Sequence, residues 1–215
     1  MRIPRQPPHL GRLQPNSLTA RQAELLDEIE ALYLREGFSR HTLDALATDL
    51  RCSKMTLYTL APSREQLAVA VIRRFLERTA SEIEHSIRLV TTTEAKIEAC
   101  IRSTAQRLLE MSEECFHEVV GFEPTRSAYD RFARDQTDAL AALLEAEGSA
   151  RSPVPAPFMA SLVRVALDSV CAREFETETG IGVDDAVDHL VALALSTSRP
   201  AGRARRAQPP ARGRG

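Results

Sequence analysis

The chain has 215 residues, 43% of them hydrophobic and 27% charged, which is enough for a small domain of about sixty residues and a second domain with a sizeable core. Its formal net charge of −2 conceals a segregation: residues 1–78 carry +3, residues 79–198 carry −11 and residues 199–215 carry +6. No stretch reaches the ~20 apolar residues of a membrane span, so a membrane is excluded as a partner.

The N-terminal residues 1–17, MRIPRQPPHLGRLQPNS, are basic and rich in proline. They lack the apolar core of a secretory signal, so we expect a disordered arm on a cytoplasmic protein. A first helix is predicted from about Thr19 to Glu36, ending at Gly37. Its inward face consists of Leu25, Leu26, Ile29 and Leu32.

Two short helices follow, at about 42–50 and 54–60. The first has an apolar face at the spacing i, i+3, i+4 and i+7, made by Leu43, Leu46, Ala47 and Leu50. Ser53 is placed to cap the second, which turns Leu57 and Leu60 inward. Pro62 stops that helix, and Ser63 with Gln66 forms the S-x-x-Q capping box of a third. This arrangement predicts a helix-turn-helix.

The outward residues of the second short helix have the chemistry of a DNA-reading surface. Lys54 can reach guanine or a phosphate, and Met55 and the Thr56 methyl can contact a thymine methyl. The hydroxyls of Tyr58, Thr59 and Thr42 suit phosphate oxygens. The alternative is that these are ordinary solvated positions on a small helix.

This run resembles the N-terminal domain of TetR/AcrR-type transcriptional regulators, whose pattern is roughly T-hydrophobic-x-x-I-A followed by G-V-S-x-x-T-L-Y-x-Y-F-x-S-K-E-x-L. The matching residues are Thr42, Leu46, Ala47, Ser53, Thr56, Leu57, Tyr58, Ser63, Glu65 and Leu67, with Arg64 in the place of the usual Lys. The resemblance implies an all-α protein with an N-terminal helix-turn-helix domain and a C-terminal helical domain for ligand binding and dimerisation. The DNA-contacting positions of the family then fall on Thr42, Ser53, Lys54, Met55, Thr56, Tyr58, Thr59 and Arg64.

Three residues depart from the family pattern. Cys52 replaces Val, Ala61 replaces an aromatic residue, and Arg51 replaces the Gly of the turn. A left-handed backbone at Arg51 would cost about 1–2 kcal/mol, which a contact between Arg51 and a DNA phosphate would offset. Alternatively, the turn adopts another geometry.

The remaining helices are predicted at 64–89, 94–112, 114–121, 126–147, 157–177 and 184–197, with a loop at 149–157. We therefore divide the chain into an arm at 1–17, a DNA-binding domain at 18–64, a ligand-binding and dimerisation domain at 65–198, and a disordered basic tail at 199–215. The tail either adds non-specific phosphate contacts or is a passive extension.

The last two predicted helices are the expected dimer surface, since each carries an apolar stripe with small residues. The candidates are Phe158, Leu162, Val165 and Ser169 with Val187, Leu190, Val191 and Ala194. The alternative is that both stripes are buried within one protomer.

An effector pocket is expected among helices 94–147 and 157–177, near the break at Gly121 and Pro124. Candidate lining residues are Met111, Phe116, His117, Phe122, Tyr129 and Phe132, although the same residues also suit a plain core. The acidic residues Glu113, Glu118 and Glu123 would favour a cationic ligand.

No metal or cofactor is expected. Glu114 and His117 have the spacing of half a carboxylate-bridged metal site, but no second Glu-x-x-His exists. The four cysteines have no C-x-x-C spacing, which predicts buried free thiols, with redox sensing as the alternative.

These features predict a one-component regulator, a repressor by resemblance, that binds a pseudo-palindromic double-stranded DNA operator as a homodimer and is released by an unknown small-molecule effector. The alternatives are a ligand-independent DNA-binding or protein-interaction module, and a helical enzyme with a vestigial helix-turn-helix. An enzyme is disfavoured because the sequence has no nucleophile–base pair, phosphate loop or metal cluster.

Overall fold

The computed structural model describes residues 18–147 and 154–198, and every regular element in these ranges is an α-helix. The predicted all-α class is confirmed. In chain order the helices are α1 (Ala20–Glu36), α2 (Leu43–Asp49), α3 (Lys54–Leu60), α4 (Arg64–Arg88), α5 (Thr93–Leu108), α6 (Glu113–Gly121), α7 (Glu123–Ala146), α8 (Ala156–Cys171), α9 (Glu174–Thr179) and α10 (Val183–Ser198). The predicted arm, the tail and most of the predicted 149–157 loop lie outside the described residues.

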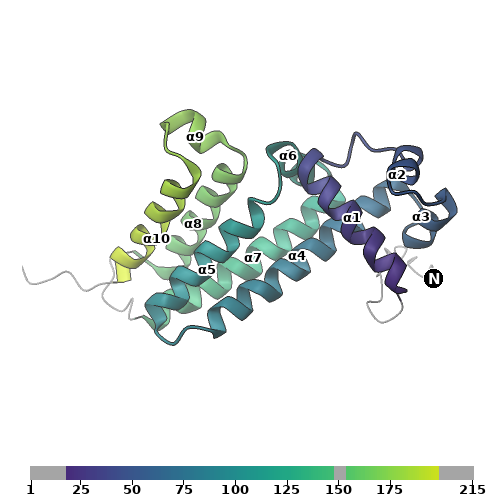
Figure 1. Cartoon of the computed structure of the whole chain (residues 1–215). Helices are drawn as coiled ribbons and strands as arrows, with labels where there is room; N and C mark the ends of the chain where they lie inside the picture. The colour runs from purple at the N-terminus through teal and green to yellow at the C-terminus, as the bar shows by residue number, and fades with distance from the viewer. Residues whose placement is uncertain (1–17, 148–153, 199–215) are drawn as a thin grey trace, which may run out of the picture.

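Helices α1, α2 and α3 form one end of the molecule, called the head below (Figure 1). A capping box begins α1: the Thr19 hydroxyl accepts from Gln22 N, and the Gln22 side chain accepts from Thr19 N. Gly37, with φ 77°, ends the helix as predicted. The core of the head is fully buried, with Leu25 and Ile29 of α1 packed in one cluster with Leu46 and Leu57.

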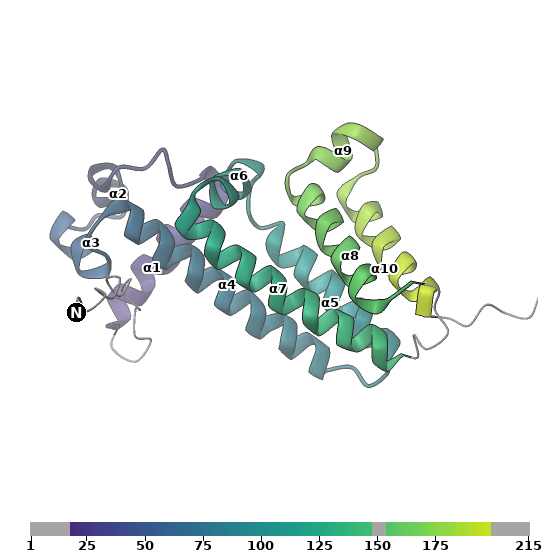
Figure 2. The ribbon, with the colours of Figure 1, turned by 180° about the vertical axis from the view of Figure 1, so that it is seen from behind.

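The 25-residue helix α4 connects the head to the rest of the chain, α5 to α10, called the body below. At 1.5 Å per residue it is about 37 Å long. It contacts α1 in the head and packs against α5 and α7 in the body. Seen from behind, α4 and α7 lie side by side, and α8 and α10 form the end of the body farthest from the head (Figure 2).

The segment predicted as one helix at 157–177 is two helices in the structure. Helix α8 ends at Cys171, Arg173 adopts a left-handed φ of 57°, and α9 begins at Glu174. Helix α9 is polar and buries no residue, so no apolar contact favours extending α8 through it. The break instead returns the chain so that α10 packs against α8 and α5.

Candidate functional site

Two side-chain caps and one left-handed residue shape the helix-turn-helix. The Thr42 hydroxyl accepts a hydrogen bond from Ala45 N at 3.1 Å, and the Ser53 hydroxyl accepts one from Thr56 N at 3.1 Å. Between these helices Arg51 has a φ of 51°, so the strained left-handed turn is the geometry present. The Arg51 side chain is exposed, and within the described residues no group binds its guanidinium.

Helix α3 presents two large apolar side chains to solvent. Met55 is 72% exposed and Tyr58 is 48% exposed, whereas Leu57 and Leu60 are buried against the head. Because Met55 and Tyr58 are three residues apart, they share one face of the helix. This face is free to meet a partner in the described structure.

Lys54, at the start of α3, makes an ion pair with Asp44 of α2. Asp44 was not among the predicted site residues, although its position two residues after the α2 cap places it beside the start of α3. Both side chains are exposed, at 49% for Lys54 and 73% for Asp44, and exposed pairs contribute about 0–1 kcal/mol. Lys54 can therefore exchange this partner for a DNA group at little cost.

The hydroxyl of Thr59 connects α3 to α1. It donates to Thr56 O at 2.6 Å and accepts from Gln22 Nε2 at 3.1 Å, and Gln22 is itself part of the α1 capping box. The hydroxyls of Ser53 and Thr56 lie 2.9 Å apart. In this state Thr59 therefore holds α3 in place on α1.

Arg64, the first residue of α4, is bound within the protein. Its Nη1 donates to Ser39 O at 2.7 Å, and its Nε lies 3.3 Å from Glu65 Oε1. The Ser63 hydroxyl caps α4 by accepting from Gln66 N at 3.1 Å. A DNA contact by Arg64 would require it to leave Ser39.

A carboxylate of the body holds the same loop from the other side. Glu118 of α6 accepts hydrogen bonds from Phe38 N at 2.5 Å and Ser39 N at 3.0 Å. The close approach depends on Gly37, because a Cβ there would lie 2.8 Å from a Glu118 carboxylate oxygen. We call Arg64, Glu118 and the 37–39 loop that they bind the Ser39 clamp.

A second head–body contact joins α6 to the same loop. Arg40 donates from Nε and Nη2 to the two Glu114 oxygens, at 2.9 and 2.6 Å, and Ser112 N donates to Leu34 O at 2.7 Å. Sequence reasoning missed the role of Glu114 and Glu118. Their i, i+4 spacing puts them on one face of α6, but it does not reveal the partner.

The body contains a hollow between α5, α7 and α8. The space within it that a water molecule can enter has a volume of about 30 Å³, and the hollow is open to solvent on one side. Tyr129 and Phe132, both predicted, line it together with Cys100 and Leu140. At its edge Tyr129 Oη donates to Asp168 Oδ1 at 2.5 Å, and Arg164 Nη1 donates to Asp168 Oδ2 at 2.6 Å. The sequence analysis did not identify Asp168 or Arg164.

The other four residues predicted for the pocket lie elsewhere. Met111 and Phe116 are buried in the core without lining the hollow, although the Phe116 ring is 5.6 Å from that of Tyr129. His117 is exposed on α6. Phe122 packs on Phe38 of the head, with ring centroids 6.1 Å apart, and lines a separate hollow of about 280 Å³ beside Gly121.

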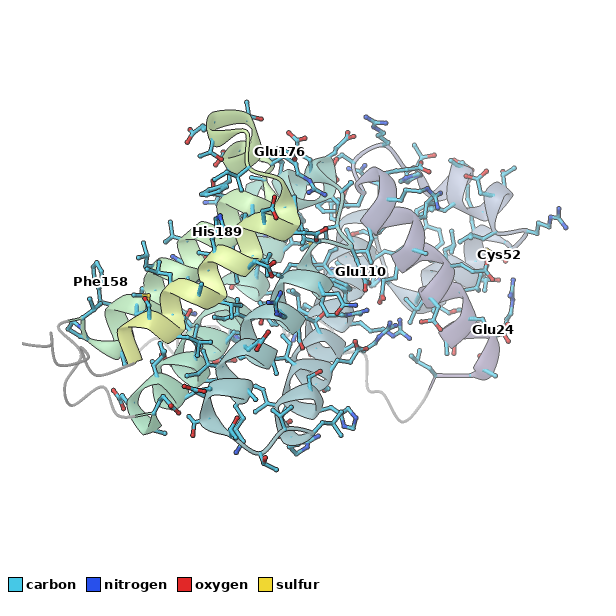
Figure 3. The ribbon with its side chains drawn as sticks, turned by 60° about the vertical axis from the view of Figure 1, so that its left-hand side comes forward. Glu24, Cys52, Glu110, Phe158, Glu176 and His189 are labelled. Atoms are coloured by element: carbon cyan, nitrogen blue, oxygen red, sulfur yellow. The ribbon has the colours of Figure 1, made fainter. Side chains whose placement is uncertain are left out.

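The structure divides the residues predicted for the dimer surface. On α8, Phe158 is 62% exposed, Leu162 40% and Val165 53%, and Ser169 is half-buried. Figure 3 shows Phe158 pointing away from the helices at the end of the molecule opposite Cys52. The four α10 candidates, Val187, Leu190, Val191 and Ala194, are buried within the protomer, because that stripe of α10 packs on α5 and α8. Among the described side chains of α10, the large apolar one that is exposed is Leu193.

Three of the four cysteines are buried thiols. Burial raises the pKa of Cys100 to about 11, and those of Cys115 and Cys171 to about 12, while Cys52 in the turn is half-buried. In residues 18–147 and 154–198 no three His, Cys, Asp or Glu side chains gather closely enough to hold a metal ion. Over the same residues, no helix combines the length and apolarity that crossing a membrane requires.

No family model and no curated protein matches this sequence. Solved structures do match its fold. A transcriptional regulator from Saccharomonospora viridis in complex with choline has a TM-score of 0.69 and 13% identity, over 80% of this chain and 94% of that one. A TetR/AcrR-family transcriptional regulator from Thermobifida fusca has a TM-score of 0.59 and 18% identity, over 84% of this chain and 100% of the other.

A third solved structure, AibR in complex with isovaleryl coenzyme A and operator DNA, has a TM-score of 0.61 and 15% identity, over 80% of this chain and 97% of that one. These similarities extend through the head and the body alike. The chain therefore has the fold of the TetR/AcrR family of transcriptional regulators.

Proposed function

We propose that this chain is a one-component transcriptional regulator of the cytoplasm, a repressor, that reads double-stranded DNA with α3. The observation that carries the proposal is the outward face of α3, where Met55 and Tyr58 are exposed beside the only lysine of the head. AibR, which has the same fold, was solved with operator DNA.

The residues of the interface have distinct roles in this proposal. Lys54 leaves Asp44 for guanine O6 or N7, and Met55 contacts a thymine methyl. Tyr58 and Arg51 bind phosphates, as do the helix N-termini at Thr42 and Ser53. Arg51 is the best placed of the flanking cations, because its guanidinium has no partner within the described residues to give up.

We further propose that the protein acts as a homodimer through α8. The exposed Phe158, Leu162 and Val165 form an apolar stripe, and burying a stripe of this kind favours association. A two-fold dimer places two α3 helices in successive major grooves about 34–36 Å apart, or a multiple of that distance. The operator would then be a pseudo-palindrome.

Release by a small molecule in the body completes the proposal. The effector must bind the free conformation more tightly than the DNA-bound one, since equal affinity shifts no equilibrium. Helix α4 and the Ser39 clamp are the routes by which a change in the body reaches the head. In this proposal residues 18–64 form the DNA-binding domain, and residues 65–198 form the domain that binds the effector and dimerises.

Selection of bound DNA from a random library tests reading and symmetry together. The full chain should select a pseudo-palindrome with half-sites one or two helical turns apart. Lys54→Ala should weaken binding to that site by about 1–3 kcal/mol and relax base preference at one position of each half-site. Lys96→Ala, which removes the other lysine of the chain from α5 in the body, is the matched control and should bind like the parent.

Recovery of sequences without symmetry, or Lys54→Ala binding with unchanged preference, would contradict this proposal. One observation favours a ligand-independent DNA binder as the second candidate: the space in the hollow that a water molecule can enter is about 30 Å³, well below the ~300–1,000 Å³ of most small-molecule sites. The two candidates differ in whether any molecule that binds the body also changes operator affinity.

A further inference from the structure

The hollow of the body has an apolar wall and one polar edge. Ile101, Leu108, Phe132 and Leu167 line the wall, and the edge is the group of Tyr129, Arg164 and Asp168. Thr104 and Thr137 also line the hollow, but their hydroxyls donate to backbone carbonyls one turn back on their own helices, and Gln136 adds an uncharged, half-buried amide. The ionic groups of the lining are Asp168 and Arg164.

Asp168 is the fixed member of this pair. One oxygen is bound by Tyr129, which is 3% exposed and comes from α7, and the Asp168 side chain is short and 28% exposed. Burial raises the pKa of Asp168 above its usual range, and the Tyr129 hydrogen bond and the Arg164 charge oppose that rise. A half-buried carboxylate held in this way needs a cationic partner.

Arg164 is the replaceable member. It lies one turn before Asp168 on the same helix, binds it through Nη1, and is 40% exposed. A long side chain at a half-exposed position can move its charge into water without leaving a buried cation unpaired. Once Arg164 swings out, the Asp168 carboxylate keeps its Tyr129 hydrogen bond and faces the apolar hollow without a cation.

The surroundings favour a second cation over an anion. An anion bound to Arg164 would lie beside Asp168, which cannot withdraw, and Asp130 on α7 is close enough to add to the negative potential at Asp168. The body region 79–198 also carries a net charge of −11, which attracts cations to it. A cation is therefore stabilised where a carboxylate of the same size is repelled.

We propose that this hollow binds a small hydrophobic ammonium ion, whose charge takes the place of the Arg164 guanidinium at Asp168 while its apolar part fills the space between α5, α7 and α8. The inference rests on the proposed function, because it names the chemical class of the effector. Arg164 lines the hollow, so its departure adds the space of its side chain to the volume of about 30 Å³ that a water molecule can already enter. Room for the ligand is created by the exchange of cations itself.

Three probes with the same six-carbon tail test the charge preference: n-hexylammonium, n-hexanol and hexanoate. Calorimetric titration of the full chain without DNA should show n-hexylammonium binding about tenfold or more tightly than either of the others, as expected for a charge-assisted hydrogen bond. Asp168→Asn should remove that preference. Arg164→Gln should strengthen ammonium binding, because it removes the competing cation, and Arg131→Gln on α7, outside the hollow, is its matched control.

Ammonium affinity should also fall as pH drops toward the raised pKa of Asp168, and Asp168→Asn should show no such dependence. The groups facing Asp168 are Arg164 and Cys171 of α8, Tyr129 and Asp130 of α7, and Cys100 of α5. The tyrosine and the thiols stay neutral at acidic pH, because burial raises the pKa of Cys100 to about 11, that of Cys171 to about 12 and that of Tyr129 above its usual range. Asp130→Asn, which leaves Asp168 in place, is the control for the charge of the exposed Asp130 and should keep the pH dependence.

Equal or tighter binding of hexanoate, or no gain from Arg164→Gln, would overturn the inference. The Arg164 variant keeps the test decisive if Asp168→Asn does not fold, since its substitution lies at a half-exposed position. Because these titrations contain no DNA, their failure is separate from a failure of operator binding. A final titration of the selected operator complex with n-hexylammonium should lower its DNA affinity; binding without that effect would support the site and contradict its role as the effector site.

Discussion

Arg51, at the centre of the helix-turn-helix, combines backbone strain with a charge that no group in residues 18–147 and 154–198 binds. Its left-handed φ of 51° costs about 1–2 kcal/mol that a glycine would not incur. Strained residues persist where the surrounding structure enforces them, and they cluster at functional positions. At Arg51 the enforcing contacts are Arg51 N to Thr48 O at 3.2 Å and Cys52 N to Ala47 O at 2.9 Å.

Arg51→Gly should make the protein more stable and a weaker DNA binder. Relief of about 1–2 kcal/mol of strain is partly offset by the ~0.5–1 kcal/mol entropic cost of a glycine, so the melting temperature should rise by about 1–3 °C. Loss of one phosphate contact should reduce the slope of log affinity against log salt by about 1.

Thermal denaturation and a salt series on the selected operator measure the two effects of this substitution separately. A higher melting temperature with an unchanged salt slope would remove the phosphate role of Arg51. Arg51→Lys, which keeps the charge and the strain, should leave both quantities near those of the parent.

At the scale of elements, the short helix α6 determines how the body holds the head. Glu118 binds two backbone N–H groups of the α1–α2 loop, and Glu114 binds Arg40 in the same loop. Arg64 of α4 donates to the carbonyl of Ser39, so the α1–α2 loop is bound by both α4 and α6. A shift of α6 relative to α4 would therefore change the hydrogen bonds of the Ser39 clamp.

Gly37→Ala should disrupt the Ser39 clamp. The new Cβ would lie 2.8 Å from a Glu118 oxygen and would occupy a residue with φ 77°, so we expect a loss of about 2 kcal/mol and a melting temperature lower by about 4–8 °C. Gly121→Ala on α6 is the matched control, since a Cβ there meets nothing within 4 Å.

The measurement for Gly37→Ala is thermal denaturation followed by circular dichroism. Gly37→Ala and Gly121→Ala with equal melting temperatures would show that the Glu118 contact does not hold the head. Glu118→Gln, which can still accept from Phe38 and Ser39, should lose less stability than Gly37→Ala.

The elements themselves follow from local patterns, which is why most could be predicted. The caps at Thr19, Ser53 and Ser63 and the stop at Gly37 act over a few residues, and each is present where the sequence places it. The break at Arg173 could not be predicted, because it is set by the return of α10 onto α5 and α8. Likewise, Tyr129 can be recognised as aromatic lining, whereas its pairing with Asp168, 39 residues later, depends on how α7 packs on α8.

For the whole molecule, the two apolar stripes near the C-terminus have different fates. The stripe of α10 completes the core of the protomer, while the stripe of α8 remains exposed at Phe158, Leu162 and Val165. The sequence pattern of the two is alike, since each repeats at helical spacing. Only the tertiary arrangement distinguishes a stripe that is already covered from one that is open to a second chain.

Val165→Asp should therefore yield monomers. A charge in the centre of the α8 stripe would be desolvated without a partner in the proposed dimer, whereas in the protomer Val165 is 53% exposed and the carboxylate remains in water. Leu89→Asp, at the C-cap of α4, is the control and should leave assembly unchanged, since Leu89 is 71% exposed and is not part of the α8 stripe.

Light scattering at micromolar concentration reports the assembly state, and circular dichroism confirms that each variant folds. A parent protein that is monomeric, or a Val165→Asp variant that pairs as well as the parent, would move the dimer contact away from α8.

Because α4 is long, a small rotation at its body end produces a much larger displacement at its head end. A rod of about 37 Å that pivots by about 5° at its body end displaces its other end by about 3 Å, close to the ~3.4 Å rise of one base-pair step. In the proposed dimer the two-fold axis would make both rods turn equally, so the spacing between the two α3 helices would change by up to about twice that amount. A rotation too small to repack the interior would thus change the distance between the two α3 helices by up to nearly two base-pair steps, and they would no longer match the grooves of the duplex.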